Sequence, residues 1–276
     1  MERPPQTVCL LLLVAAAVVL GAAGFRWRQA RALNVAKPSL PAAFSEAMPA
    51  RVLWAWEEPE DLHALPPTVG VAYLAETLLV GDLLIALPRR QPLRTALDAR
   101  VMAVVRIETR AGFVDTPELR ASVATRLAEI GRRNNLRALQ VDFDANASQR
   151  EFYAGVLKLL KPQLPLGLPL SITALVSWCG ADSWLHGLPI DEAVPMFFRM
   201  GGPRAISSQG PRFYRLAEPL CRGSVGVATD EPWPANFNTL NSSTRVYIFA
   251  PRPWRDAQFA VVSSVANTSL AQELVR

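Results

Sequence analysis

Eight short runs of apolar residues recur along the chain from residue 51 onward, and each run is bounded by turn-forming or charged residues. They occupy residues 51–56, 68–75, 101–108, 136–143, 168–175, 192–200, 223–229 and 245–250. Short continuous apolar runs are typical of strands that are buried on both faces, as in a parallel sheet. The pattern therefore predicts eight buried strands.

Two connections between these runs have the periodicity of amphipathic helices. Residues 116–135 begin with Thr116 as the expected N-cap, and residues 148–165 begin with Ser148, followed three residues later by Glu151 as a capping box. Strands that alternate with helices indicate a parallel sheet, and eight of them favour a (β/α)8 TIM-type barrel. The connections after the fifth, sixth and seventh strands are short, so several helices are expected to be short or missing. An open doubly wound sheet is the alternative.

The N-terminal segment differs from the rest of the chain. Residues 8–24 contain no charge, Arg3 precedes them, and several arginines follow. This arrangement favours a signal peptide or an N-terminal membrane anchor over residues 1–24, followed by a linker over 25–50 and the barrel domain over 51–276. The protein is therefore expected to be exported, either periplasmic or anchored to the inner membrane and facing the periplasm. An uncleaved segment would make the membrane a partner.

Charge and histidine content exclude several classes of site. The formal net charge is +5, but basic residues do not form a consecutive block, so nucleic acid is not an expected partner. His63 and His186 are the two histidines, and neither stands in ligand spacing with cysteine or another histidine. A zinc site and a Ser-His-Asp triad are therefore not expected, and no cofactor is predicted.

Two cysteines lie within the predicted barrel. Cys179 follows the fifth strand, at the carboxyl end of the barrel, whereas Cys221 precedes the seventh strand, at the opposite end. A disulfide requires Cα atoms within about 7 Å, which is less than the height of a barrel. The strand positions therefore predict two free thiols.

Candidate chemistry concentrates at the end of the fourth strand. Gln140, Asp142 and Asp144 alternate along "LQVDFD", so their side chains point the same way. The carboxyl ends of barrel strands form the active face of this fold. Two neighbouring carboxylates raise the pKa of at least one of them, which suits the acid and base of glycoside cleavage, and they could also bind a divalent cation in a metal-dependent hydrolase.

Other strand ends would add polar and aromatic side chains to the same rim. These candidates for substrate binding are Trp56, Glu57, Arg106, Glu108, Trp178, Arg199, Asp230, Glu231 and Trp254, together with Gln140. Aromatic rings beside charged groups suit a sugar, which stacks its C–H faces on rings and donates its hydroxyls to polar groups. The alternative interpretation is structural: Arg106 would pair with Asp142 in a polar cluster that closes the barrel, and the tryptophans would pack in the core.

Several sequence blocks resemble a known family. "VLWAWEEPEDL", "VVRIE", "QVDFDANASQREFY", "PLSITALVSWC", "LPIDEAVPMFFRMG" and "SVGVATDE" resemble the bacterial domain of unknown function 3142 family over roughly residues 51–254. This resemblance implies a bacterial, exported protein and assigns no activity.

The fourth strand is also similar to that of the chitinase-like family 18 glycoside hydrolases, whose strand ends in alternating acidic residues with the general acid last. That alignment puts Asp144 at the acid and Gln140 at the first acidic position, where this chain departs from the pattern. The sixth strand offers Phe197 and Phe198 where that family uses a tyrosine. The sequence thus predicts a glycoside-hydrolase-like barrel, with Asp144 as general acid and Asp142 tuning its pKa. The alternative is a non-catalytic envelope protein that binds glycans or acts as a scaffold.

Overall fold

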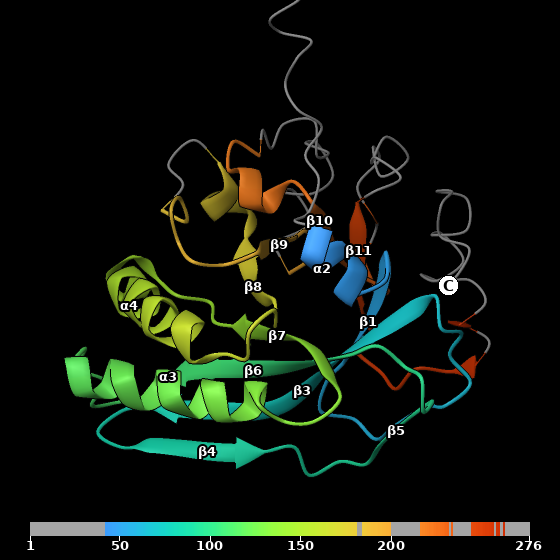
Figure 1. Ribbon diagram of the computed structural model, residues 1–276, viewed down its shortest axis with the longest axis horizontal. Helices are drawn as coiled ribbons and strands as arrows, with labels where there is room; N and C mark the ends of the chain where they lie inside the picture. Colours follow the sequence, from blue (N-terminus) through green and yellow to red (C-terminus); the bar gives the residue numbers. More distant parts are fainter. Residues whose placement is uncertain are drawn as a thin grey trace, which may run out of the picture. The chain divides into compact units, whose positions relative to one another are not determined.

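The chain folds into a closed barrel of parallel strands (Figure 1). The computed structural model describes residues 42–180, 184–199, 216–231, 233, 244–256, 258, 259 and 262. Within them, eight parallel strands pair in the order β1-β11-β10-β9-β8-β7-β6-β3, and β1 also pairs with β3, which closes the ring. These strands are β1 (Arg51–Ala55), β3 (Val69–Val80), β6 (Val101–Thr109), β7 (Leu136–Asp142), β8 (Leu170–Leu175), β9 (Glu192–Met196), β10 (Ser224–Ala228) and β11 (Arg245–Phe249). Each matches a predicted apolar run, and the barrel is confirmed over the open sheet.

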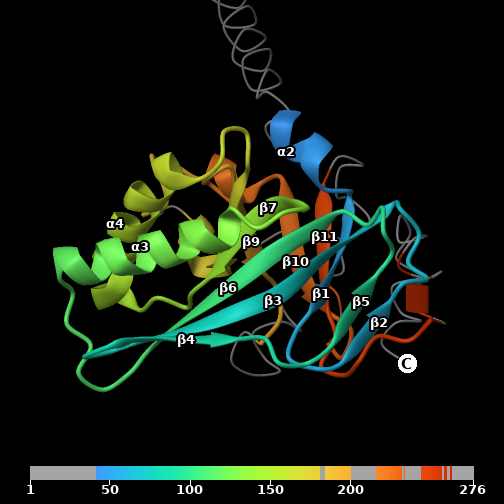
Figure 2. The ribbon, with the colours of Figure 1, turned by 60° about the horizontal axis from the view of Figure 1, so that its bottom comes forward.

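Three further strands were not predicted from the sequence. The antiparallel strand β4 (Leu84–Pro88) pairs with the second half of β3, which extends beyond the predicted run and forms a long projecting hairpin (Figure 2). The short strands β2 (Glu60–Leu62) and β5 (Leu93–Thr95) form a separate two-stranded parallel sheet. The connections that flank β3 therefore carry strands where a regular barrel has helices.

Both predicted helices are present. Helix α3 (Pro117–Gly131) is capped as expected, because the Thr116 side chain accepts a hydrogen bond from the amide of Leu119. Helix α4 (Arg150–Leu160) follows the short 3-10 helix η1 (Ala147–Gln149), and the expected cap at Ser148 is wrong. Asn146 forms the capping box with Gln149 instead, because its side chain accepts the Ser148 amide at 3.0 Å.

Short 3-10 helices are further helical elements that the structure describes. These are η2 (Lys161–Gln163), which follows α4 directly, η3 (Val176–Cys179), which follows β8, and η4 (Pro219–Cys221), which precedes β10. Both η3 and η4 pack against β9.

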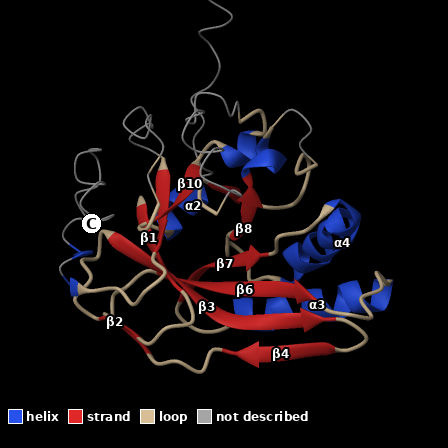
Figure 3. Ribbon diagram, turned by 180° about the vertical axis from the view of Figure 1, so that it is seen from behind, coloured by secondary structure: helices blue, strands red, loops and turns tan. Residues whose placement is uncertain are grey.

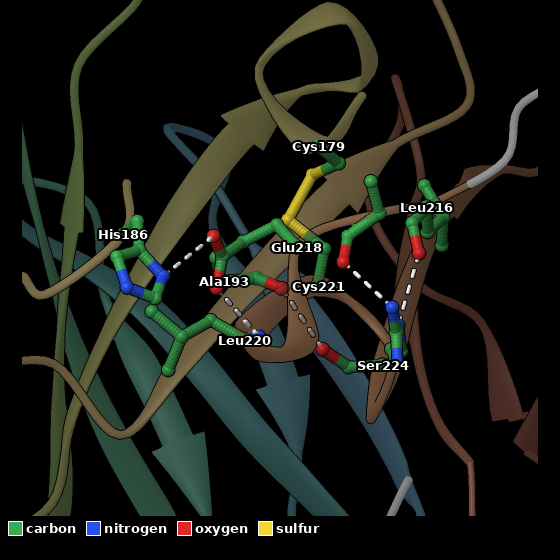
Figure 4. Close-up of a disulfide and its surroundings, with 10 residues drawn as sticks. Cys179, His186, Ala193, Leu216, Glu218, Leu220, Cys221 and Ser224 are labelled. Carbon is green, nitrogen blue, oxygen red and sulfur yellow. Dashed lines mark hydrogen bonds and ion pairs between the residues drawn. A yellow bond between two sulfur atoms is a disulfide. The ribbon is translucent and has the colours of Figure 1, made fainter. Parts of the chain in front are cut away.

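The prediction of two free thiols is wrong. Cys179 and Cys221 form a disulfide with a Cα–Cα distance of 5.8 Å, and Figure 4 shows the bridge beside Glu218. The prediction assumed that each cysteine stays at its own end of the barrel. The 3-10 segments instead run along the outer side of β9, where the Cys179 carbonyl accepts the Ala217 amide, so both cysteines reach the same buried layer.

Part of the segment that was expected to be a linker packs against the barrel. Helix α2 (Ala42–Ala47) lies in the part expected to be linker, and Phe44 and Met48 are fully buried in the same cluster as interior barrel residues. The apolar segment 8–24 lies outside the described residues. No helix among the described residues is long and apolar enough to span a membrane.

Helix α2 is tied to the barrel interior by a buried ion pair. Arg245 on β11 bonds Glu192 on β9 at 3.0 Å, and its guanidinium also donates to the carbonyls of Phe44, Met48 and Pro49. Glu192 further accepts hydrogen bonds from the hydroxyls of Ser171 and Tyr247. Both charged groups are almost completely buried, so they depend on this set of partners.

Candidate functional site

A cavity of about 530 Å³ opens at the carboxyl ends of the barrel strands. Its walls combine charged, hydroxyl, aliphatic and aromatic side chains from β1, β6, β7, β8, β9, β11 and the segments that follow them. The lining residues are Trp54, Trp56, Arg106, Asp142, Asp144, Thr173, Leu175, Val176, Ser177, Met196, Phe198, Arg199 and Phe249. This is the end of the barrel at which the paired aspartates were expected, and the mouth is not filled by tryptophan side chains.

Asp142 forms the deeper part of the polar wall. It is the last residue of β7 and pairs in register with Arg106 on β6, whose Nε lies 4.0 Å from Asp142 Oδ2. The hydroxyl of Thr173 on β8 donates to Asp142 Oδ1 at 2.6 Å. Burial, together with the negative charge of Asp144, raises the pKa of Asp142 to about 6, against the opposing effects of Thr173 and Arg106.

Asp144 lies nearer to solvent than Asp142, in the loop that leaves β7. This loop is held at both sides: the Ala145 amide donates to the Phe143 carbonyl at 2.8 Å, and Gln149 donates to Thr109 Oγ1 at the end of β6 at 2.8 Å. Desolvation by the surrounding walls raises the pKa of Asp144, and the Arg106 charge partly offsets it. A carboxyl with a raised pKa at an open mouth can deliver a proton to a bound molecule.

Arg106 connects the carboxylates to the aromatic side of the cavity. Its Nε lies 3.0 Å from Glu108 Oε1, and its guanidinium lies 6.0 Å from the centre of the Trp56 ring. The expected pairing of Arg106 with Asp142 is therefore present, but the group lines a cavity and does not close the barrel. Two acidic neighbours and one aromatic face fix the position of this cation.

The opposite wall is aromatic. Phe198 and Phe249 stack in parallel with their ring centres 5.6 Å apart, and Trp56 meets Phe249 edge to face at 6.2 Å. Trp54 completes the wall, with its indole Nε1 donating to Gln140 at 2.8 Å. A Cβ added at Gly226 would lie 2.9 Å from the Trp54 ring, so glycine at this position of β10 makes room for the indole.

Arg199 borders the mouth, as expected, but its positive charge is already paired with two carboxylates. It bonds Asp230 at 2.7 Å and Glu231 at 2.5 Å, and its own backbone amide donates to Glu231. Arg199 has a φ of 56°, a left-handed conformation that is uncommon for residues other than glycine. Asp230 and Glu231 hold this arginine and do not themselves line the cavity.

Several predicted site residues lie elsewhere. Gln140 is fully buried beneath the cavity, where its amide bonds both Trp54 and Ser171. Trp178 packs in the core against Trp184, and Trp254 is buried with its indole bonded to the Trp54 carbonyl. Glu57, an exposed residue, and Glu108 are not among the lining residues. The structural interpretation is therefore correct for Trp178 and Trp254.

Sequence reasoning missed eight of the thirteen lining residues. The residues not predicted are Trp54, Thr173, Leu175, Val176, Ser177, Met196, Phe198 and Phe249. Trp54 could have been found, because it shares the face of Trp56 in an alternating strand. The apolar members could not, since a buried run gives no sign of which residue faces a cavity.

The raised pKa of Asp142 gives a stability prediction that does not depend on any substrate. The folded-state pKa of about 6 exceeds the ordinary value, so the stability linked to protonation is present below about pH 4 and lost as pH rises through 6. Asp142→Asn removes this loss. The free energy of unfolding of the variant, relative to wild type, should therefore increase by about 2–3 kcal/mol between pH 4 and pH 7.

Urea unfolding at each pH measures this difference. Subtracting the wild type is necessary, because burial also raises the pKa of Glu60 to about 7. A difference that stays constant with pH would contradict the burial of an ionisable Asp142.

Among the described residues, no group of three or more His, Cys, Asp or Glu side chains is arranged to hold a metal ion.

The fold is similar to the crystal structure of the Bacillus cereus spore cortex-lytic enzyme SleL, with 17% identity and a TM-score of 0.42. The match covers 64% of this chain and 51% of that one, so the chain spans about half the length of SleL. No curated protein matches the sequence. Residues 98–200 match the model of a domain of unknown function, DUF3142, which confirms the family resemblance of this part of the chain.

Proposed function

We propose that the protein is a glycoside-hydrolase-like barrel that binds a saccharide in its mouth and cleaves a glycosidic bond there. One observation carries the proposal: Asp142 and Asp144 line the same cavity as an aromatic wall of Trp54, Trp56 and Phe249. A sugar presents C–H faces that suit aromatic rings and hydroxyls that suit carboxylates and arginine. A cavity of about 530 Å³ lies within the usual range for small-molecule sites.

The two carboxyl groups divide the chemistry by their surroundings. Asp144 is the more accessible of the two, and its raised pKa supports a role as the acid that protonates the leaving glycosidic oxygen. Asp142 lies deeper, and above about pH 6 its carboxylate is ionised. It would then stabilise the positive charge that develops at the anomeric carbon. A water molecule adds to that carbon and gives its proton to the Asp144 carboxylate, which completes the hydrolysis and restores the acid. Asp230 and Glu231 are less suited to this role, because both already pair with the Arg199 guanidinium and neither lines the cavity.

The assay uses soluble oligomers of glucose, N-acetylglucosamine and uronic acids, and it measures new reducing ends together with binding by tryptophan fluorescence. One class should be cleaved, and Trp56→Ala should raise its KM about tenfold, whereas Trp56→Phe, which keeps an aromatic face, should stay near wild type. Binding without new reducing ends would support the non-catalytic glycan-binding alternative. Absence of both signals for every oligomer would refute the proposal.

A further inference from the structure

The face of the barrel that carries Arg106 and Asp142 continues outward onto the β4 hairpin. Strands β7, β6, β3 and β4 lie side by side in Figure 3, and their register links Asp142 to Arg106, Arg106 to Thr77, and Thr77 to Leu87. Laterally paired residues point to the same face of a sheet. Because Asp142 and Arg106 line the cavity, Thr77 and Leu87 lie on the continuation of the cavity face.

The next row of the sheet repeats this arrangement. Glu108 on β6 pairs with Leu79 on β3, and Leu79 pairs with Ile85 on β4. The alternate residues Leu84 and Ala86 point the other way and pack against the hydrophobic core. The cavity face thus changes from charged side chains on β6 to aliphatic side chains on β3 and β4, about 10 Å away at the sheet spacing. We define Leu79, Ile85 and Leu87 as the apolar shelf.

The shelf is exposed in a position where soluble proteins usually avoid apolar residues. Ile85 is 49% exposed and Leu87 is 42% exposed. Within the described residues β4 is the terminal strand of the sheet, and none of its five residues is charged. Edge strands normally carry charges that discourage contact. An uncharged, aliphatic edge that continues the sheet face of a candidate binding cavity is suited to contact an apolar part of a ligand.

The chemistry of the shelf distinguishes between the possible ligands. Further sugar units of a polysaccharide would favour aromatic rings, such as those on the cavity wall, whereas leucine and isoleucine offer only aliphatic contacts. We propose that the shelf binds the aliphatic chain of a glycolipid whose sugar occupies the cavity. This inference rests on the proposed function, because it assigns the substrate class of the same site.

Alkyl glycosides test the proposal without knowledge of the natural lipid. Methyl and octyl glycosides of glucose, galactose and N-acetylglucosamine are titrated below the micelle concentration, with tryptophan fluorescence as the readout. The octyl form of the bound sugar should bind at least tenfold more tightly than the methyl form. Ile85→Thr/Leu87→Thr, which places β-branched residues with high strand propensity at both positions, should reduce this ratio to about one. Leu166→Thr, at a fully exposed leucine in another loop, should preserve it.

The possible outcomes distinguish a failure of the shelf proposal from a failure of the function proposed for the cavity. Equal binding of the two forms by wild type, or an unchanged ratio in the double variant, would overturn the shelf while sugar binding stands. If 1-octanol bound as tightly as the octyl glycoside, the shelf proposal would also be overturned, since the aliphatic chain would then bind without the sugar. A wild-type dimer in light scattering that the double variant abolishes would assign the surface to a second copy instead. If no glycoside binds at all, the proposed function itself fails.

Discussion

Asp144→Asn should lower kcat for the cleaved oligosaccharide by about 10³-fold while leaving the dissociation constant of the oligosaccharide near that of wild type. Positioned general acids contribute about 10²–10⁴-fold to turnover. Asparagine keeps the shape of the side chain but cannot donate the proton that the leaving oxygen requires. The effect on binding is expected to be small, because the aromatic wall and Arg106 supply contacts that the substitution leaves in place.

Folding of this variant is not at risk, because Asp144 is exposed at the mouth. Thermal unfolding of Asp144→Asn should therefore show no loss of stability relative to wild type, which separates a chemical role from a structural one. Residual turnover within a few-fold of wild type would show that another group supplies the proton.

The largest stability effect is expected at Arg245. Arg245→Met leaves the Glu192 carboxylate buried without its cation and removes the donor to the carbonyls of Phe44, Met48 and Pro49. Breaking a buried ion pair by removing one partner costs about 3–5 kcal/mol. Urea unfolding should show a loss of this size or greater.

A control variant and a compensating second substitution test whether the broken ion pair causes the loss of stability in Arg245→Met. Arg94→Met removes an exposed arginine that pairs with Asp61, and it should cost less than about 1 kcal/mol. Adding Glu192→Gln to Arg245→Met should recover part of the loss, because the unpaired charge is then absent. A loss at Arg245 no larger than the loss at Arg94 would show that helix α2 does not depend on this ion pair.

The positions of the barrel strands could be predicted because each strand is buried on both faces. Such strands give uninterrupted apolar runs, and the turn residues between them mark their ends. The hairpin strand β4 was missed although its residues are also apolar. Its apolar residues follow those of β3 with little interruption, so the sequence gives no sign that Ile85 and Leu87 are exposed.

The residues of the candidate site also divide into those that the sequence predicts and those that it does not. Asp142, Asp144 and Arg106 could be placed from sequence, since alternation along a strand fixes which residues share a face. The roles of Trp178 and Trp254 could not, because these residues lie beyond the strands, where no period constrains the chain. The disulfide between Cys179 and Cys221 depends on 3-10 segments that return along the outside of β9, and hydrophobic periodicity carries no information about such a path.

The most direct test is a crystal structure of Asp144→Asn with an oligosaccharide that wild type cleaves. Our account predicts a sugar ring against Trp56 and Phe249, with its glycosidic oxygen within hydrogen-bonding distance of residue 144 and the carboxyl group of Asp142 beneath the ring. An oligosaccharide bound elsewhere on the barrel, with the mouth between β6 and β11 left empty, would contradict it.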